Sequence, residues 1–142
     1  IAGDIRGLAE PALAFTPPDA PDDADDGLLT ASEAGQLRLA ADWVILSACN
    51  TAAPDGTPGA EGLSGLAAAF LYAGARGLLV SHWPVGDAAA ERLTQGAVAR
   101  LAADPALGQA GALAAAMEDL RADPAFAHPS AWAPFVVVGD GR

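Results

Sequence analysis

Three short apolar runs constrain the fold of this chain more than any other feature. They are "WVILS" (43–47), "GLLVS" (77–81) and "PFVVVGD" (134–140). Each is too short for a typical helix and rich in β-branched residues, which predicts buried strands. Longer segments with helical spacing of apolar residues lie between them. Continuous apolar strands that alternate with helices indicate an α/β fold with a mainly parallel sheet covered on both faces.

The helical segments carry recognisable start and stop signals. Thr30 followed by Glu33 is a capping box and predicts a short helix in "LLTASEAGQLRL" (28–39). A second helix is predicted over 62–74, with Gly74 as its C-terminal stop. Asp87 is expected to cap a third helix that runs to about Ala103, and residues 107–123 form a fourth. The stretch "PALAF" (11–15) is a short apolar run, and the proline- and aspartate-rich residues 16–27 predict an exposed loop.

Composition excludes several functional classes. The chain has 142 residues, of which 52% are hydrophobic and 18% charged, which suits one globular domain or a large piece of one. A formal net charge of -11 disfavours nucleic-acid binding, because such a surface repels phosphate. No stretch approaches the roughly 20 apolar residues of a membrane span. A single cysteine allows no intrachain disulfide, so we expect a cytoplasmic protein.

That cysteine, Cys49, follows the first apolar strand within "WVILSACNTA". Ligand and catalytic sites of parallel sheets gather at the carboxyl ends of strands, so Cys49 has the position of a nucleophile. A nucleophilic thiol also needs a neighbouring base, usually histidine. The alternative is a small buried side chain that only packs there.

The order of the segments resembles a known family. "DDGLLTASEAGQLRLAADWVILSACNTA", "GLSGLAAAFLYAGARGLLVSHWPVGDAAAERL" and "HPSAWAPFVVVGD" together resemble the CHAT family of caspase-like cysteine peptidases from about residue 25 to 140. This family is often joined to tetratricopeptide repeats and is related more distantly to separase. The resemblance implies a caspase-like three-layer α/β sandwich without cofactor or metal. It also implies that Cys49 attacks a peptide carbonyl in a protein substrate.

The sequence departs from the family in one respect. The family's histidine lies upstream, in a block that ends in His-Gly, and no histidine precedes Cys49 here. We therefore interpret residues 1–142 as the C-terminal portion of a single CHAT domain that lacks its first strands and is inactive as a peptidase alone. The alternative is a non-catalytic domain that binds a protein partner and keeps only the fold.

Three further residues are candidates for the site. His82 follows the second apolar strand and is either a base paired with Cys49, a residue that lines the pocket, or a packing residue. Asp87 is either a helix cap or, as the resemblance to separase-like proteins implies, the receptor for a basic substrate residue. Trp83 is close enough in sequence to line a pocket, although packing against the sheet is its more ordinary role. His128 and Trp132 are expected to be a loop residue and a packing residue.

The stretch "DDADDGLLTASE" (22–33) partly matches the pattern of a calcium-binding loop. Asp22, Asp26 and Glu33 occupy ligand positions of such a loop, but Ala24 occupies another and cannot coordinate. The capping box explains Glu33 better, and no metal site is predicted.

Overall fold

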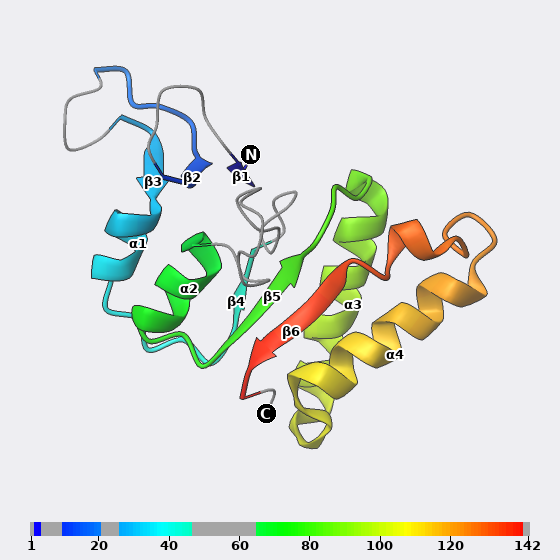
Figure 1. Cartoon of the computed structure of the whole chain (residues 1–142). Coiled ribbons are helices and arrows are strands. Elements are labelled where there is room, and N and C mark those ends of the chain that lie inside the picture. Colours follow the sequence, from blue (N-terminus) through cyan, green and yellow to red (C-terminus); the bar gives the residue numbers. More distant parts are fainter. Residues whose placement is uncertain (1, 4–9, 21–25, 47–64, 141–142) are drawn as a thin grey trace, which may run out of the picture.

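The computed structural model describes residues 2–3, 10–20, 26–46 and 65–140. Their strands form two separate sheets of three strands each, with the orders β1-β2-β3 and β4-β5-β6 (Figure 1). The first sheet consists of β1 (Ala2–Gly3), β2 (Ala12–Ala14) and β3 (Leu28–Thr30). The second consists of β4 (Val44–Ile45), β5 (Gly77–Ser81) and β6 (Phe135–Gly139). The helices are α1 (Ala31–Gln36), α2 (Gly65–Tyr72), α3 (Asp87–Ala103) and α4 (Gly108–Ala122), with short 3-10 turns at Pro105–Leu107 (η1) and Pro129–Ala131 (η2).

The second sheet lies between two pairs of helices, and every residue of β5 is buried (Figure 1). Leu78 and Val80 point into one apolar cluster, which includes Leu66 and Phe70 of α2. Their neighbour Leu79 points into the other cluster, with side chains from α3, α4 and β6. Alternate strand residues therefore meet different helical layers, as strand geometry requires. The predicted α/β class and the burial of the central strand on both faces are confirmed.

The direction of the strands differs in part from the prediction. β4 and β5 are parallel, with Val44 opposite Leu78, whereas β5 and β6 are antiparallel, with Leu79 opposite Val137. The pairs of the first sheet are antiparallel as well. A mainly parallel sheet is therefore not established for the described strands. The reason is the connection between β5 and β6, because α3 and α4 pack as an antiparallel helical hairpin that returns the chain in the opposite direction.

The predicted helix signals are present in the structure. Thr30 and Glu33 form both bonds of the capping box at the start of α1. At the end of α2, the Gly74 amide donates to the Leu71 carbonyl (3.1 Å) and the Ala75 amide to the Phe70 carbonyl (3.1 Å). This pair of bonds is a Schellman motif, and Gly74 adopts the positive φ of +108° that it requires.

The first sheet was not predicted. Residues 28–30 do not belong to the predicted helix. They pair with β2, so that Thr30 lies opposite Ala12, and the helix begins only at Ala31. Ala12 is fully buried by this pairing. Contacts between residues distant in sequence decided the structure here, because an isolated run of three residues carries no periodicity that distinguishes strand from helix.

Candidate functional site

The carboxyl ends of β4 and β5 lie at the same edge of the second sheet. Their parallel register pairs Ile45 with Leu79, and the Leu46 amide donates to the Leu79 carbonyl at 2.9 Å. Cys49 follows Leu46 by three positions in the sequence, and it belongs to residues 47–64, outside the described residues. The structure therefore describes the strand that leads to the predicted nucleophile, and the position of its thiol stays a prediction.

His82 follows β5 at this edge. Its backbone amide donates to the Pro134 carbonyl (3.1 Å), which extends the ladder between β5 and β6 by one residue. Its side chain is exposed, whereas the preceding Ser81 is buried. Among the described residues, no side chain makes a hydrogen bond or an ion pair with the imidazole. His82 is thus accessible at the predicted edge and is not a core residue.

The loop before β6 holds the side chain of Trp83 near the carboxyl end of β5. Its indole Nε1 donates to the Ser130 carbonyl at 3.3 Å, while 41% of the residue remains exposed. Ser130 belongs to η2, where its amide donates to Nδ1 of His128 at 3.2 Å. His128 is therefore a loop residue, as expected, and its side chain also caps a 3-10 turn, which was not predicted. Trp83 combines one fixed polar contact with an exposed aromatic surface.

A hollow of about 370 Å³ lies between the segment after β5 and the loop before β6. Its lining comprises residues 84–89, Phe126, Ser130 and Ala131. Asp87 supplies the carboxylate of this lining. The hollow is large enough for one amino-acid side chain, and its wall combines apolar groups with a negative charge.

The predicted capping role of Asp87 is wrong by one residue. Gly86 occupies the N-cap position of α3 in an extended conformation, and no side-chain hydrogen bond caps the helix. Asp87 is the first helical residue, and its side chain is exposed. A carboxylate in the first turn is stabilised by the helix dipole without being used by a cap. The carboxylate therefore stays available to a ligand in the hollow.

Asp123, at the end of α4, holds the loop that contributes Phe126 to the hollow. The Ala125 amide donates to one carboxylate oxygen (2.9 Å), and Arg92 of α3 forms an ion pair with the other. These contacts, first the Ala125 amide and then Arg92, lower the pKa of Asp123 below its ordinary value of 3.8. The same guanidinium lies over the ring of Phe126, 5.5 Å from its centroid. The loop that carries Phe126 is thereby tied to α3.

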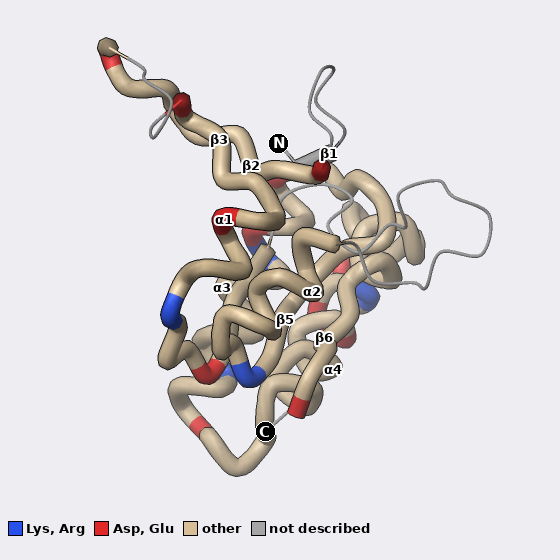
Figure 2. Tube along the Cα trace, turned by 60° about the vertical axis from the view of Figure 1, so that its left-hand side comes forward, with Lys and Arg blue, Asp and Glu red and all other residues tan. Residues whose placement is uncertain are grey.

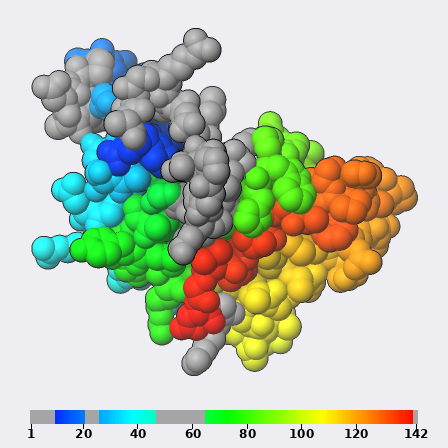
Figure 3. Space-filling view, in the orientation of Figure 1, coloured from blue at the N-terminus to red at the C-terminus, as the bar shows by residue number. Residues whose placement is uncertain are grey.

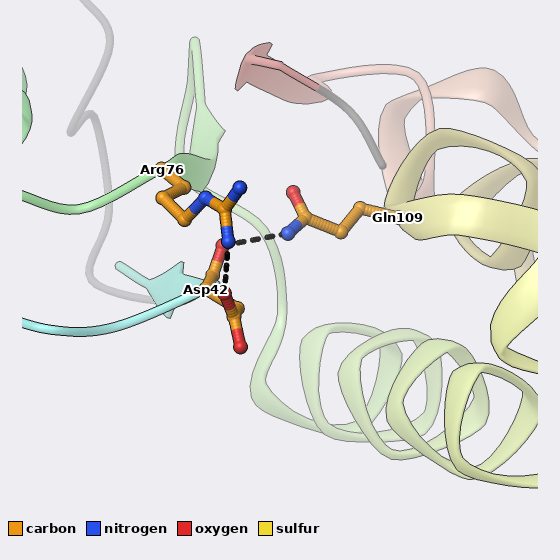
Figure 4. A network of polar contacts seen from close by, with 3 residues as sticks. All are labelled: Asp42, Arg76 and Gln109. Carbon is orange, nitrogen blue, oxygen red and sulfur yellow. Dashed lines mark hydrogen bonds and ion pairs between the residues drawn. The ribbon is translucent and has the colours of Figure 1, made fainter.

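A polar network at the opposite end of the sheet has a structural role (Figure 4). The buried Gln109 donates to the backbone carbonyl of Asp42 at 2.7 Å, and Arg76 forms an ion pair with the Asp42 carboxylate at 3.1 Å. A Cβ at Gly77 would lie 2.1 Å from Oε1 of Gln109, so this contact needs glycine at the start of β5. The network joins α4 to the segments before β4 and β5. Sequence reasoning missed it, since its members are far apart in the chain.

The described segments contain neither a cluster of metal-ligating side chains nor a helix that could span a membrane. No group of 3 or more His, Cys, Asp or Glu side chains in them is arranged to hold a metal ion. Glu33 accepts hydrogen bonds from the amide and the hydroxyl of Thr30, which supports the capping interpretation over calcium binding. Asp22 and Ala24 lie outside the described residues. No helix in the described part of the chain is long and apolar enough to cross a membrane.

The sequence is similar to a known protein family. The family model described as "CHAT domain" matches residues 4–140. Tetratricopeptide repeat protein 28 of Mus musculus is 38% identical over 112 residues, which cover 79% of this chain and 4% of that protein. The Homo sapiens protein of the same name is 35% identical over 130 residues, which cover 83% of this chain and 5% of that protein. The chain thus spans about a twentieth of the length of these relatives. No solved structure matches it.

Proposed function

Because this chain belongs to the CHAT domain family, we propose that it is the C-terminal portion of a caspase-like cysteine endopeptidase domain with Cys49 as nucleophile. One observation carries the proposal. The parallel register of β4 and β5 directs the strand that leads to Cys49 and the segment from His82 to Asp87 to the same edge. A nucleophile after β4 would there lie beside a hollow that accepts a side chain.

The chemistry follows from a thiol and a histidine. The base takes the proton of the Cys49 thiol, and the sulfur attacks the carbonyl carbon of the scissile peptide bond. Backbone amides, including that of Cys49, stabilise the oxyanion. The protonated histidine then gives its proton to the leaving amine, which leaves an acyl-enzyme. Water activated by the same histidine hydrolyses this thioester and restores the thiol.

Two sources of the histidine remain in the proposal. The family resemblance assigns this role to a residue upstream of Ile1, and in that case residues 1–142 are inactive alone. His82 is the second candidate, since its exposed imidazole lies at the same edge. In a longer polypeptide with both histidines, replacing the upstream one by alanine should abolish turnover, whereas His82→Ala should keep most of it. The reverse result would assign the base to His82.

Substrate preference is assigned to Asp87. Its exposed carboxylate lines the hollow and forms no ion pair with any described residue. A guanidinium or ammonium group in the hollow would gain a charge-assisted hydrogen bond there. We therefore propose Arg or Lys as the substrate residue before the cleaved bond, with Trp83 close to the peptide and no metal or cofactor involved.

An upstream strand is proposed along the outer edge of β4. Among the described strands, β4 pairs only with β5. Beside it lies an open groove of about 400 Å³ lined by Ile45, Thr94, Gln95, Val98 and Ala99. Val98 of this groove is 46% exposed. An apolar strand before Ile1 would cover these side chains and bring the family's histidine towards the edge that carries Cys49. We also propose that tetratricopeptide repeats occur in the same polypeptide and that the protein is cytoplasmic.

A non-catalytic binding domain is the second candidate function. Its support is the net charge of -11, which suits a basic protein partner. Acidic residues are distributed along the described trace (Figure 2). Cys49→Ala separates the two functions, because it abolishes a peptidase function and leaves a binding function intact.

A further inference from the structure

The loop that follows α4 forms one wall of the hollow beside Asp87. Phe126 and residues of η2 supply this wall, and residues 84–89 supply the opposite one. In the space-filling view the two walls lie side by side on one face of the molecule, with the segment after β5 in light green and the loop in orange (Figure 3). The half-buried ring of Phe126 also packs against the apolar cluster of α3, α4 and β6. The position of this loop therefore sets the width of the hollow.

The backbone of the loop forms a tight turn at Asp123. The Phe126 amide donates to the Asp123 carbonyl and the Ala125 amide to the Asp123 carboxylate, both at 2.9 Å. These bonds shape the turn, but each spans three residues or fewer and neither reaches another element. A contact with a neighbouring helix is needed to hold the wall in place.

Arg92 of α3 provides this contact twice. Its guanidinium forms an ion pair with Asp123 and lies over the ring of Phe126, 5.5 Å from the centroid. Arg92 also follows Ala88 by four positions, so it lies one turn further along the same face of α3. Ala88 lines the opposite wall of the hollow. A single side chain thus joins the two walls.

We propose that Arg92 is a positioning residue that fits the hollow to a long basic side chain. The Phe126 ring, held by Arg92, packs against the apolar stem of that side chain, and the Asp87 carboxylate binds its cationic head. The ring does not attract the head, because a guanidinium already lies over it. The inference rests on the proposed function for the source of the side chain, which is the substrate residue before the cleaved bond.

The ion pair with Asp123 keeps the positive charge of Arg92 from opposing this fit. Asp87 is the charged residue of the lining, and the guanidinium of Arg92 is compensated by the Asp123 carboxylate. The field inside the hollow is therefore negative. Arg92 can fix the wall without repelling a cation that enters.

Binding of benzamidine tests the inference without any need for turnover. This probe carries a flat cation on an apolar ring, and benzamide is a neutral counterpart of nearly the same shape. In an NMR titration of residues 1–142, benzamidine should shift the signals of the Asp87 amide and the Phe126 ring and should bind more tightly than benzamide. In Arg92→Leu its dissociation constant should rise about fivefold, because the aromatic wall is no longer fixed.

Two further variants separate this role from a general loss of stability. Arg92→Lys keeps a cation that can reach Asp123 and the ring, so it should retain most of the affinity. Arg100→Leu removes a similar ion pair, to Asp119, from the same two helices about two turns away from the hollow, and should leave the affinity unchanged. Equal losses in Arg92→Leu and Arg100→Leu, or a chain that binds benzamidine no better than benzamide, would overturn the inference.

Peptide hydrolysis by the longer polypeptide distinguishes failure of this inference from failure of the proposed function. Arg92→Leu should raise KM about fivefold for peptides with arginine before the cleaved bond and leave kcat unchanged, because the wall contributes equally to binding of substrate and transition state. Turnover with the same KM in Arg92→Leu as in the unmodified polypeptide would refute the role of Arg92 alone. Absence of turnover, with benzamidine bound in the predicted order of variants, would refute the peptidase and support the role of Arg92.

Discussion

At the scale of single residues, Asp123 shows how a carboxylate links pH to the fold. One of its oxygens accepts the Ala125 amide and the other pairs with Arg92, so ionisation of the group is favoured in the folded chain. Its pKa is accordingly lower than that of an ordinary aspartate. A group with a lowered folded-state pKa contributes its stability above the unfolded-state pKa and loses it as the pH falls through the folded-state value.

Asp123→Asn should therefore destabilise the chain at neutral pH, and the difference from the unmodified chain should shrink as the pH falls below about 3.8, the ordinary value. Urea unfolding of both proteins at a series of pH values measures this difference. Asp19→Asn is a suitable control, because Asp19 is exposed and has no hydrogen bond or ion pair among the described residues. A difference that stays constant down to the lowest pH would contradict the proposed link.

The carboxylate of Asp87 leads to a prediction about specificity. In the complete domain, Asp87→Asn should lower kcat/KM for peptides with arginine before the cleaved bond by roughly tenfold or more, since a charge-assisted hydrogen bond is lost. Peptides with leucine at that position should change little. Glu91→Gln removes the same charge one turn further along α3, where Glu91 is bonded to Gln95, and should leave both rates unaltered. Equal losses in both variants would remove Asp87 from the binding site.

At the scale of elements, alanine in place of a glycine should have opposite effects at a helix end and inside a helix. It should lower the free energy of unfolding at the helix end and raise it inside the helix. An alanine Cβ at Gly74 would lie 2.4 Å from the Leu39 carbonyl oxygen, and φ there is +108°. Gly74→Ala should cost about 2 kcal/mol or more in the free energy of unfolding. Gly111, inside α4, has only ordinary contacts from 3.5 Å outwards, so Gly111→Ala should stabilise by about 0.5–1 kcal/mol. Thermal unfolding shows whether each variant is less or more stable than the unmodified chain. A change in the same direction in both variants would contradict the role given to Gly74.

The elements that sequence predicted well are those whose signal is local. The capping box of Thr30 and Glu33, the stop at Gly74 and the apolar run of β5 each depend on neighbours within a few residues. The pairing of β2 with β3 and the direction of β6 depend on contacts between distant residues, which local patterns do not encode. Asp87 lies between these cases, because the helix start was predicted to within one residue.

At the scale of the whole molecule, the groove beside β4 allows a test of the proposed upstream strand. Val98 lines the groove and is 46% exposed here, so Val98→Asp should change the stability of residues 1–142 by no more than about 0.5 kcal/mol. In a polypeptide whose upstream strand covers the groove, the same change should cost about 1–3 kcal/mol, because it buries a charge or prevents docking. Urea unfolding of the two lengths compares these costs. An equal loss of stability in the two polypeptides would argue against an upstream strand beside β4.

The candidate site illustrates what sequence contributes to function. His82 and Trp83 are predicted from their place after the second apolar run, and Asp87 from the resemblance to separase-like proteins. In the structure Asp87 lines the hollow, and Trp83 is hydrogen-bonded to Ser130, another residue of its lining. The contribution of the loop before β6, through Ser130 and Phe126, was not predicted, because the antiparallel return of the chain brings it there. Cys49 itself was predicted from its strand and from the family resemblance, and its thiol lies outside the described residues.

Covalent labelling shows whether Cys49 is a nucleophile that becomes activated within the complete CHAT domain, as we propose. A peptidyl acyloxymethyl ketone with arginine next to the reactive group would be added to residues 1–142 and to a longer polypeptide with the upstream segment. Residues 1–142 contain a single cysteine, so a modified peptide that contains Cys49 identifies the site by mass spectrometry. We predict rapid labelling of Cys49 in the longer polypeptide, loss of labelling when its upstream histidine is replaced, and slow labelling of residues 1–142. Equally slow labelling in all three would contradict the peptidase account and favour the binding domain.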